Sequence, residues 1–165
     1  MAAFSPKSRA CSGGRSDIPL TLKTMSPGDG EATHKLYHGA ICIVLAAGFS
    51  KVERDIELAP PGPIADLAGL PKALLPVAGK PMLDHWWEYL FQDRSISDIF
   101  LVSNALKYKH FERWATAKGI GVSRIVNSGV TAPTKGRGVL RDVELGLRRA
   151  AQVLGCIDNR DVLIF

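Results

Sequence analysis

The residues that decide the fold are 41–48, ICIVLAAG, an apolar run that ends in three residues with almost no side chain. Consecutive apolar residues bounded by Gly39 and Gly48 are typical of a strand buried on both faces of a parallel sheet. The small residues at its end let a ligand approach the backbone, whose free N–H groups can bind phosphate. The stretch therefore predicts a ligand-binding turn at the end of a buried strand.

Two lysines further along the chain favour an anionic ligand for this turn. Lys72 follows Pro71, and Lys80 lies between Gly79 and Pro81. Ammonium groups near a bare backbone turn suit a phosphorylated small molecule.

Two segments carry a resemblance to a known family. Leu45-Ala46-Ala47-Gly48, followed by PKALLPVAGKP at residues 71–81, resembles the sugar-phosphate nucleotidylyltransferases. The signature of that family is L-A-A-G-x-G-T-R, a variable spacer, and then P-K-x-L-L-P-V-x-G-K-P. The second half is matched almost without gaps.

The first half of the signature departs from the family pattern, because no second glycine follows Phe49. Aligned without a gap, Val52 falls where the family has its arginine. Aligned with one residue deleted, Ser50 and Lys51 take the Thr-Arg positions. We prefer the second alignment, since Lys51 keeps a positive charge near the phosphates, although lysine binds phosphate less well than a bidentate arginine.

The resemblance implies a nucleotidyl transfer. An oxygen of a sugar 1-phosphate attacks the α-phosphate of a nucleoside triphosphate and expels pyrophosphate, with Mg²⁺ bridging phosphate oxygens. It implies Lys51 and Lys72 as catalytic residues, and Lys80 as a structural one. The implied nucleotide-binding residues are Leu45, Ala46, Ala47, Gly48, Asn127 and Gly138.

In the family, the aspartate that binds the catalytic metal follows the strand that corresponds to residues 161–165. No residue of this chain is therefore predicted to bind metal. Residues 39–165 are expected to form the nucleotide-binding part of a catalytic domain, incomplete at its C-terminus and inactive alone. The sequence does not identify the base or the sugar. It also leaves the oligomeric state open, and a homo-oligomer is one of the possibilities.

The alternation of helices and strands predicts an α/β fold, with a Rossmann-like, mainly parallel sheet flanked by helices and right-handed crossovers. The resemblance implies the nucleotide-diphospho-sugar transferase type of this fold. Helices are expected from Pro81, over about 106–118 and after Gly138, and further strands over 99–102, 122–126 and 161–165. Residues 52–70 are expected to be a loop, either a functional lid or a surface insertion.

The three helices are expected to bury one apolar side each. The first should bury Leu83, Trp86, Trp87, Leu90 and Phe91, the second Phe111, Trp114 and Ala115, and the third Leu140, Val143, Leu147, Ala150, Ala151 and Leu154. Stacking of the tryptophans on a base is the alternative to core packing.

Residues 127–138 form a polar interval between a strand and a helix, where ligands bind in open α/β sheets. Lys135 and Arg137 precede the helix N-terminus, which attracts anions. The interval predicts either a base-binding loop or a flexible glycine-rich turn.

Composition narrows the class of protein. The chain has 165 residues, enough for one domain, and a net charge of +5 that is scattered rather than clustered with aromatics, which argues against nucleic acid. Its apolar runs are too short to span a membrane. Its three cysteines lack metal-site spacing, which indicates a reducing, cytoplasmic location. Residues 1–38 are expected to be a disordered tail, and the basic, serine-containing start favours an organellar transit peptide as the alternative.

Two other functions compete with nucleotidyl transfer. A nucleotide- or sugar-phosphate-binding regulatory module would keep the fold without the chemistry, as the altered glycine motif suggests. A nicotinamide-dependent oxidoreductase is disfavoured, because no G-x-G-x-x-G follows the first strand and Ser103-Asn104 stands where an acidic ribose ligand is expected.

Overall fold

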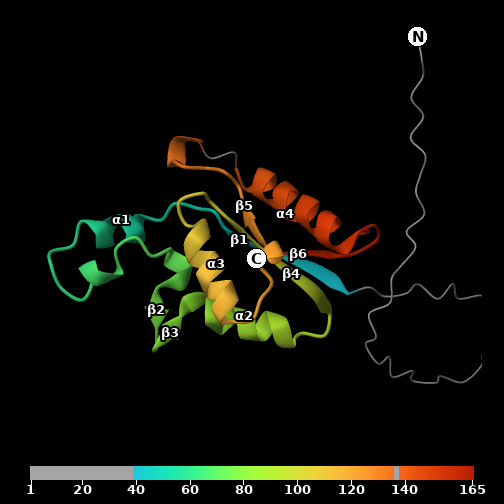
Figure 1. The fold of residues 1–165 in the computed structure, drawn as a ribbon, viewed down its shortest axis with the longest axis horizontal. Coiled ribbons are helices and arrows are strands. Elements are labelled where there is room, and N and C mark those ends of the chain that lie inside the picture. Colours follow the sequence, from blue (N-terminus) through green and yellow to red (C-terminus); the bar gives the residue numbers. More distant parts are fainter. Residues whose placement is uncertain (1–38, 136–137) are drawn as a thin grey trace, which may run out of the picture. The chain divides into compact units, whose positions relative to one another are not determined.

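The computed structural model describes residues 39–135 and 138–165, and their core is one parallel four-stranded sheet. The strand order is β5-β4-β1-β6, and all three neighbouring pairs are parallel (Figure 1). The strands are β1 (Ala40–Ala46), β4 (Ile96–Ser103), β5 (Ile125–Asn127) and β6 (Val162–Ile164). The predicted α/β class, with a parallel Rossmann-like sheet between helices, is confirmed. The predicted tail at residues 1–38 lies outside the described residues.

Helices cover both faces of this sheet. On one face, α2 (Met82–Gln92) and α3 (Tyr108–Ala117) pack against Cys42, Val44 and Leu101. On the other face, α4 (Val139–Leu154) packs against Ile41 and Ile43, because successive side chains of a strand point to opposite faces. A separate two-stranded hairpin is formed by β2 (Pro76–Val77) and β3 (Lys80–Pro81).

The central strand is buried as its apolar run predicts. Residues 41–43 have no exposed surface. Burial raises the pKa of the Cys42 thiol to about 11, so this cysteine stays a neutral packing group at physiological pH.

The helix α4 approaches the sheet through a glycine. A Cβ built on Gly146 would lie 2.7 Å from Cγ2 of Ile43 and 3.2 Å from Cγ2 of Val102. The apolar side predicted for α4 does face the sheet, because Leu147, Ala150 and Leu154 pack against it. Of the six residues expected on its apolar side, Ala150 is buried, whereas Leu140 is 85% exposed.

The apolar stripe of α2 is narrower than predicted. Leu83 and Trp87 are buried, but Trp86 is 51% and Phe91 77% exposed, so their expected core packing is wrong. Each helical residue advances by about 100°, which places Trp86 and Phe91 at the two edges of the stripe. The Trp86 ring instead contacts the Phe165 ring, with centroids 5.2 Å apart. The stripe predicted for α3 is confirmed, since Phe111, Trp114 and Ala115 are buried.

Two boundaries also differ from the prediction. The expected loop at residues 52–70 contains the helix α1 (Lys51–Glu57) and a 3₁₀ helix at Ala65–Leu67. The expected strand at 122–126 begins with a 3₁₀ helix, Val122–Arg124, so that β5 starts only at Ile125.

The fourth strand forms where it was predicted, at the edge of the sheet beside β1. The apolar side chains of residues 162–165 are each between 41% and 52% exposed.

In the described ranges, no helix is long and apolar enough to cross a membrane.

Asp84 joins the two helices on one face of the sheet. Its carboxylate accepts a hydrogen bond from Trp114 Nε1 at 2.7 Å and forms an ion pair with Lys118 at 2.6 Å. Burial acts to raise the pKa of Asp84, but the bonds from Lys118 and Trp114 outweigh it, and the pKa is lowered. The ionised form is therefore the one that holds α2 against α3.

The variant Asp84→Asn should lower the free energy of unfolding by about 1–2 kcal/mol near neutral pH, because Lys118 loses its charged partner. A carboxyl group whose pKa is lower in the folded than in the unfolded protein contributes its full stabilisation above the unfolded pKa of about 3.9. That stabilisation is lost as the pH falls through the folded pKa. Urea unfolding across the acidic range should show the two proteins converging only below about pH 4. The exposed Asp66→Asn is the control, and a difference that is constant with pH would contradict the assignment.

Candidate functional site

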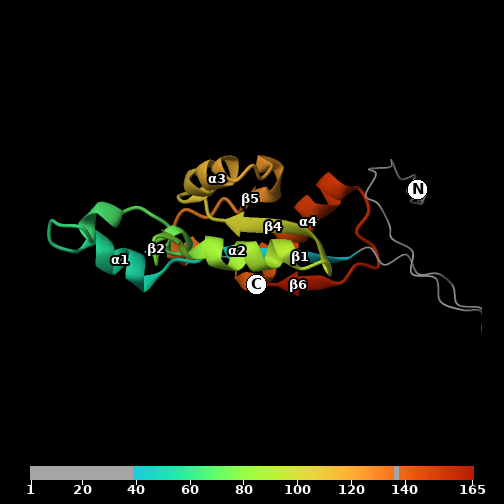
Figure 2. The same ribbon diagram turned by 90° about the horizontal axis from the view of Figure 1, so that it is seen from below.

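The candidate site lies at the carboxyl ends of β1 and β4, where open parallel sheets bind ligands. Figure 2 shows α1 at the end of the sheet toward which the β4 arrow points. A cavity of about 380 Å³ opens here beside the turn after β1. It is lined by Leu45, Ala46, Gly48, Phe49, Ser50, Glu53, Pro71, Lys72, Ala73, Met82 and Phe111.

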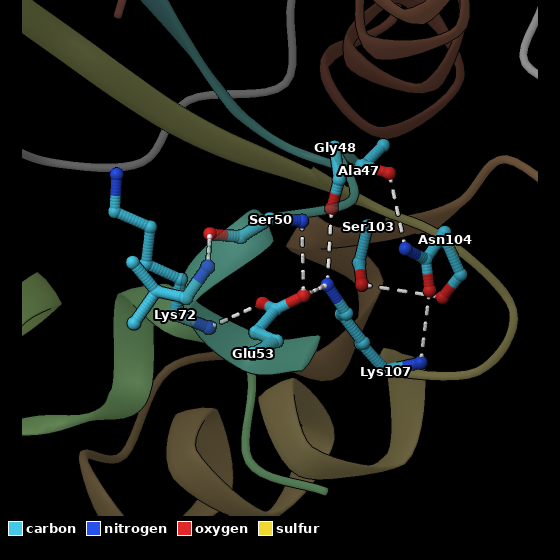
Figure 3. A network of polar contacts seen from close by, with 9 residues as sticks. Ala47, Gly48, Ser50, Glu53, Lys72, Ser103, Asn104 and Lys107 are labelled. Atoms are coloured by element: carbon cyan, nitrogen blue, oxygen red, sulfur yellow. Dashed lines mark hydrogen bonds and ion pairs between the residues drawn. The ribbon is translucent and has the colours of Figure 1, made fainter. Parts of the chain in front are cut away.

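Two carbonyls of the turn accept hydrogen bonds from side chains that follow β4 (Figure 3). Asn104 Nδ2 donates to the carbonyl of Ala47 at 3.0 Å. Lys107 Nζ donates to the carbonyl of Gly48 at 3.0 Å. Both side chains belong to buried residues, so the turn rests on a fixed polar support.

Glu53 connects three separate segments at this support (Figure 3). Its Oε1 accepts a hydrogen bond from the backbone N–H of Lys72 at 2.6 Å. Its Oε2 accepts from the N–H of Ser50 at 3.2 Å and forms a short ion pair with Lys107. The Ser50 hydroxyl in turn accepts from Val52 N–H, which makes a capping box at the start of α1.

Lys72 is one of the residues that line the cavity. Its backbone is held by Glu53, while its side chain extends away from that carboxylate (Figure 3). The ion pairs within residues 39–135 and 138–165 do not include its ammonium group. Lys72 is therefore an exposed residue with a fixed backbone in the lining of the cavity.

Lys51 is placed next to the cavity rather than in its wall. It is the first residue of α1, and its side chain is exposed. Ala47, the first residue of the turn, accepts a hydrogen bond from Asn104 and does not line the cavity. Leu45, Ala46 and Gly48 do line it.

Asn127 and Gly138 are not brought to this cavity. Asn127 ends β5, and its Oδ1 accepts a hydrogen bond from the N–H of Gly129 at 2.8 Å. Gly138 precedes α4 with a φ of 84°, a left-handed conformation that favours glycine. The side chains of Lys135 and Arg137 lie outside the described residues.

Glu53, Asn104 and Lys107 are site residues that the sequence did not identify. The pattern Ser50-x-x-Glu53 is a capping-box signal and could have indicated α1. Asn104 and Lys107 carried no such signal, because their contacts are with residues 57 and 59 positions earlier in the chain.

The carboxylate at the cavity already has partners within the protein. Glu53 is the carboxylate that lines the cavity, and both of its oxygens are engaged by Lys107 and two N–H groups. Across the part of the chain that the structure describes, no cluster of three or more His, Cys, Asp or Glu side chains could hold a metal ion.

Comparison with known proteins adds no assignment. Neither the protein-family models nor the curated proteins include a match to this chain.

The variant Glu53→Ala should lower the free energy of unfolding by about 3–5 kcal/mol, because it leaves a buried ammonium group and two N–H donors without their acceptor. Urea unfolding measures the change. Glu57→Ala, an exposed acid on the same helix, is the matched control and should shift stability by less than about 0.5 kcal/mol. Equal midpoints for the two variants would show that Glu53 does not hold these segments together.

Proposed function

We propose that the turn after β1 binds the triphosphate of a nucleoside triphosphate, and that the chain belongs to a sugar-phosphate nucleotidylyltransferase. The observation that carries this proposal is the cavity itself, which combines a bare backbone turn with the exposed cation of Lys72. The finer fold assignment, the nucleotide-diphospho-sugar transferase type, is part of the same proposal and rests on the sequence motifs at 45–48 and 71–81.

The backbone of the turn supports an anionic ligand. Within the described residues, the N–H groups of Gly48 and Phe49 make no hydrogen bond, while the carbonyls of Ala47 and Gly48 are bound on the inner side. Backbone N–H groups of a glycine-containing turn bind phosphate oxygens without a side chain in between.

The charges around the cavity favour the same ligand. Glu53 would repel a phosphate, but its charge is offset by the ion pair with Lys107. Lys72 then adds an exposed positive charge at the cavity wall, and Lys51 adds a second one at the start of α1. We assign Lys72 to the reacting phosphates and Lys51 to the outer part of the triphosphate.

The chemistry that this site would support is transfer by positioning and charge neutralisation. An oxygen of the sugar 1-phosphate forms a bond to the α-phosphorus, the bond from that phosphorus to the bridging oxygen breaks, and pyrophosphate leaves. Mg²⁺ would enter with the triphosphate and neutralise its oxygens. Asn127 and Gly138 remain the candidates for the base, on the loop that follows β5.

A second candidate function is a regulatory module that binds a nucleotide or sugar phosphate without transfer. It is favoured by the absence of a metal-binding carboxylate cluster from the described ranges. Measurement of pyrophosphate release with nucleoside triphosphate, sugar 1-phosphate and Mg²⁺ separates the two. Because residues 39–165 are expected to be inactive alone, the assay uses a protein extended past Phe165. Release then supports the enzyme, and binding without release supports the module.

The variant Lys72→Ala should weaken triphosphate binding by about 1.5–3 kcal/mol, the range for hydrogen bonds to charged groups, and leave the fold intact. Calorimetric titration with several nucleoside triphosphates and Mg²⁺ measures this. Lys80→Ala is the matched control, because the Lys80 ammonium is paired with Glu88 at 2.9 Å. If both variants bind like the wild type, Lys72 does not belong to the site.

A further inference from the structure

Lys107 is a buried lysine whose side chain ends directly beneath the candidate anion-binding turn. Its ammonium group donates to the carbonyl of Gly48 at 3.0 Å, pairs with Glu53, and lies 5.4 Å from the centre of the Phe49 ring. Its own backbone N–H donates to Asn104 Oδ1 at 3.0 Å. Asn104 and Lys107 therefore form one unit, at the point where the chain passes from β4 into α3.

This unit sets the direction in which the turn presents its N–H groups. In a trans peptide the C=O and the following N–H point in opposite directions, and the peptides of this turn are trans. The bond from Asn104 Nδ2 to the carbonyl of Ala47 consequently directs the N–H of Gly48 away from Asn104. The bond from Lys107 to the carbonyl of Gly48 directs the N–H of Phe49 in the same manner.

Lys107 also offsets the negative charge that Glu53 brings to the site. Glu53 lines the cavity, and its carboxylate would oppose an incoming phosphate chain. Among the described residues, Lys107 is the one that forms an ion pair with Glu53. Without that ammonium group the turn would lose one of its two carbonyl anchors and gain an uncompensated negative neighbour.

We propose that Asn104 and Lys107 are positioning residues that aim the N–H groups of Gly48 and Phe49 at a polyphosphate and neutralise Glu53 beside it. This inference rests on the proposed function, because it gives the role of residues that touch the turn and not the ligand.

The test uses the full chain, inorganic triphosphate as the ligand, and the backbone amide NMR signals of Gly48 and Phe49. In the wild type both signals should move on titration. In Lys107→Met the affinity should fall about ten- to hundredfold, the equivalent of one lost charged hydrogen bond. The signals of the ligand-free turn should also differ from the wild type. Lys109→Met removes an exposed lysine of the same helix and should change neither.

A double variant, Lys107→Met with Glu53→Gln, keeps the site neutral if the single variant unfolds. It should fold and recover part of the affinity, because the repulsion is gone, but its ligand-free turn signals should remain unlike those of the wild type. Lys107→Arg, which retains a donor and the charge, should recover more.

The outcomes separate the two proposals. If the wild-type turn does not respond to triphosphate, the proposed function is wrong and this inference falls with it. If the wild type binds and a folded Lys107→Met or double variant binds equally well, or shows wild-type signals in its free turn, the inference alone is wrong.

Discussion

The structure depends on the position of β1 between β4 and β6, with helices over both of its faces. Residues 41–43 have no exposed surface, and their backbone pairs with a strand on each side. A strand enclosed in this way cannot shift its register by one residue without turning its apolar side chains to the wrong face. The point at which Ala46 leaves the sheet is therefore fixed, and the turn that follows starts from a rigid base.

Rigidity at that base does not by itself orient the turn. Residues 47–50 have no regular structure of their own, and their order comes from side chains supplied by α1 and by the segment after β4. An ion pair with both partners largely buried gives little net stability, since desolvation offsets most of the attraction. Its value here is geometric, because Glu53 and Lys107 bring together segments that the sheet alone would leave independent.

The sequence predicted the parts of the fold that depend on local patterns. Apolar runs identified β1 and β4, and the 3.6-residue period identified α3 with its buried Phe111 and Trp114. Lys72 was singled out because the proline before it belongs to the motif of residues 71–81, and its role at the site stays a prediction. It did not predict Glu53, Asn104 and Lys107 as a group, since their meeting depends on how strands pack and not on spacing. The helix α1 was missed because the prolines at 60–63 dominated the composition of residues 52–70. Trp86 and Phe91 were misplaced because a stripe drawn from spacing alone does not show how wide the contact with the sheet is.

The close contact at Gly146 gives the core an influence on a distant loop. Gly138, the residue before α4, lies eight residues earlier, about 12 Å along the helix axis. The helix also packs on the sheet through Leu147, Ala150 and Leu154, so its distance from β1 and β4 is fixed over several turns. Any side chain at position 146 would force α4 or Ile43 to move, because a Cβ there would lie 2.7 Å from Cγ2 of Ile43. The absence of a side chain at Gly146 thus fixes how closely α4 lies on β1, and with it where the helix starts after Gly138.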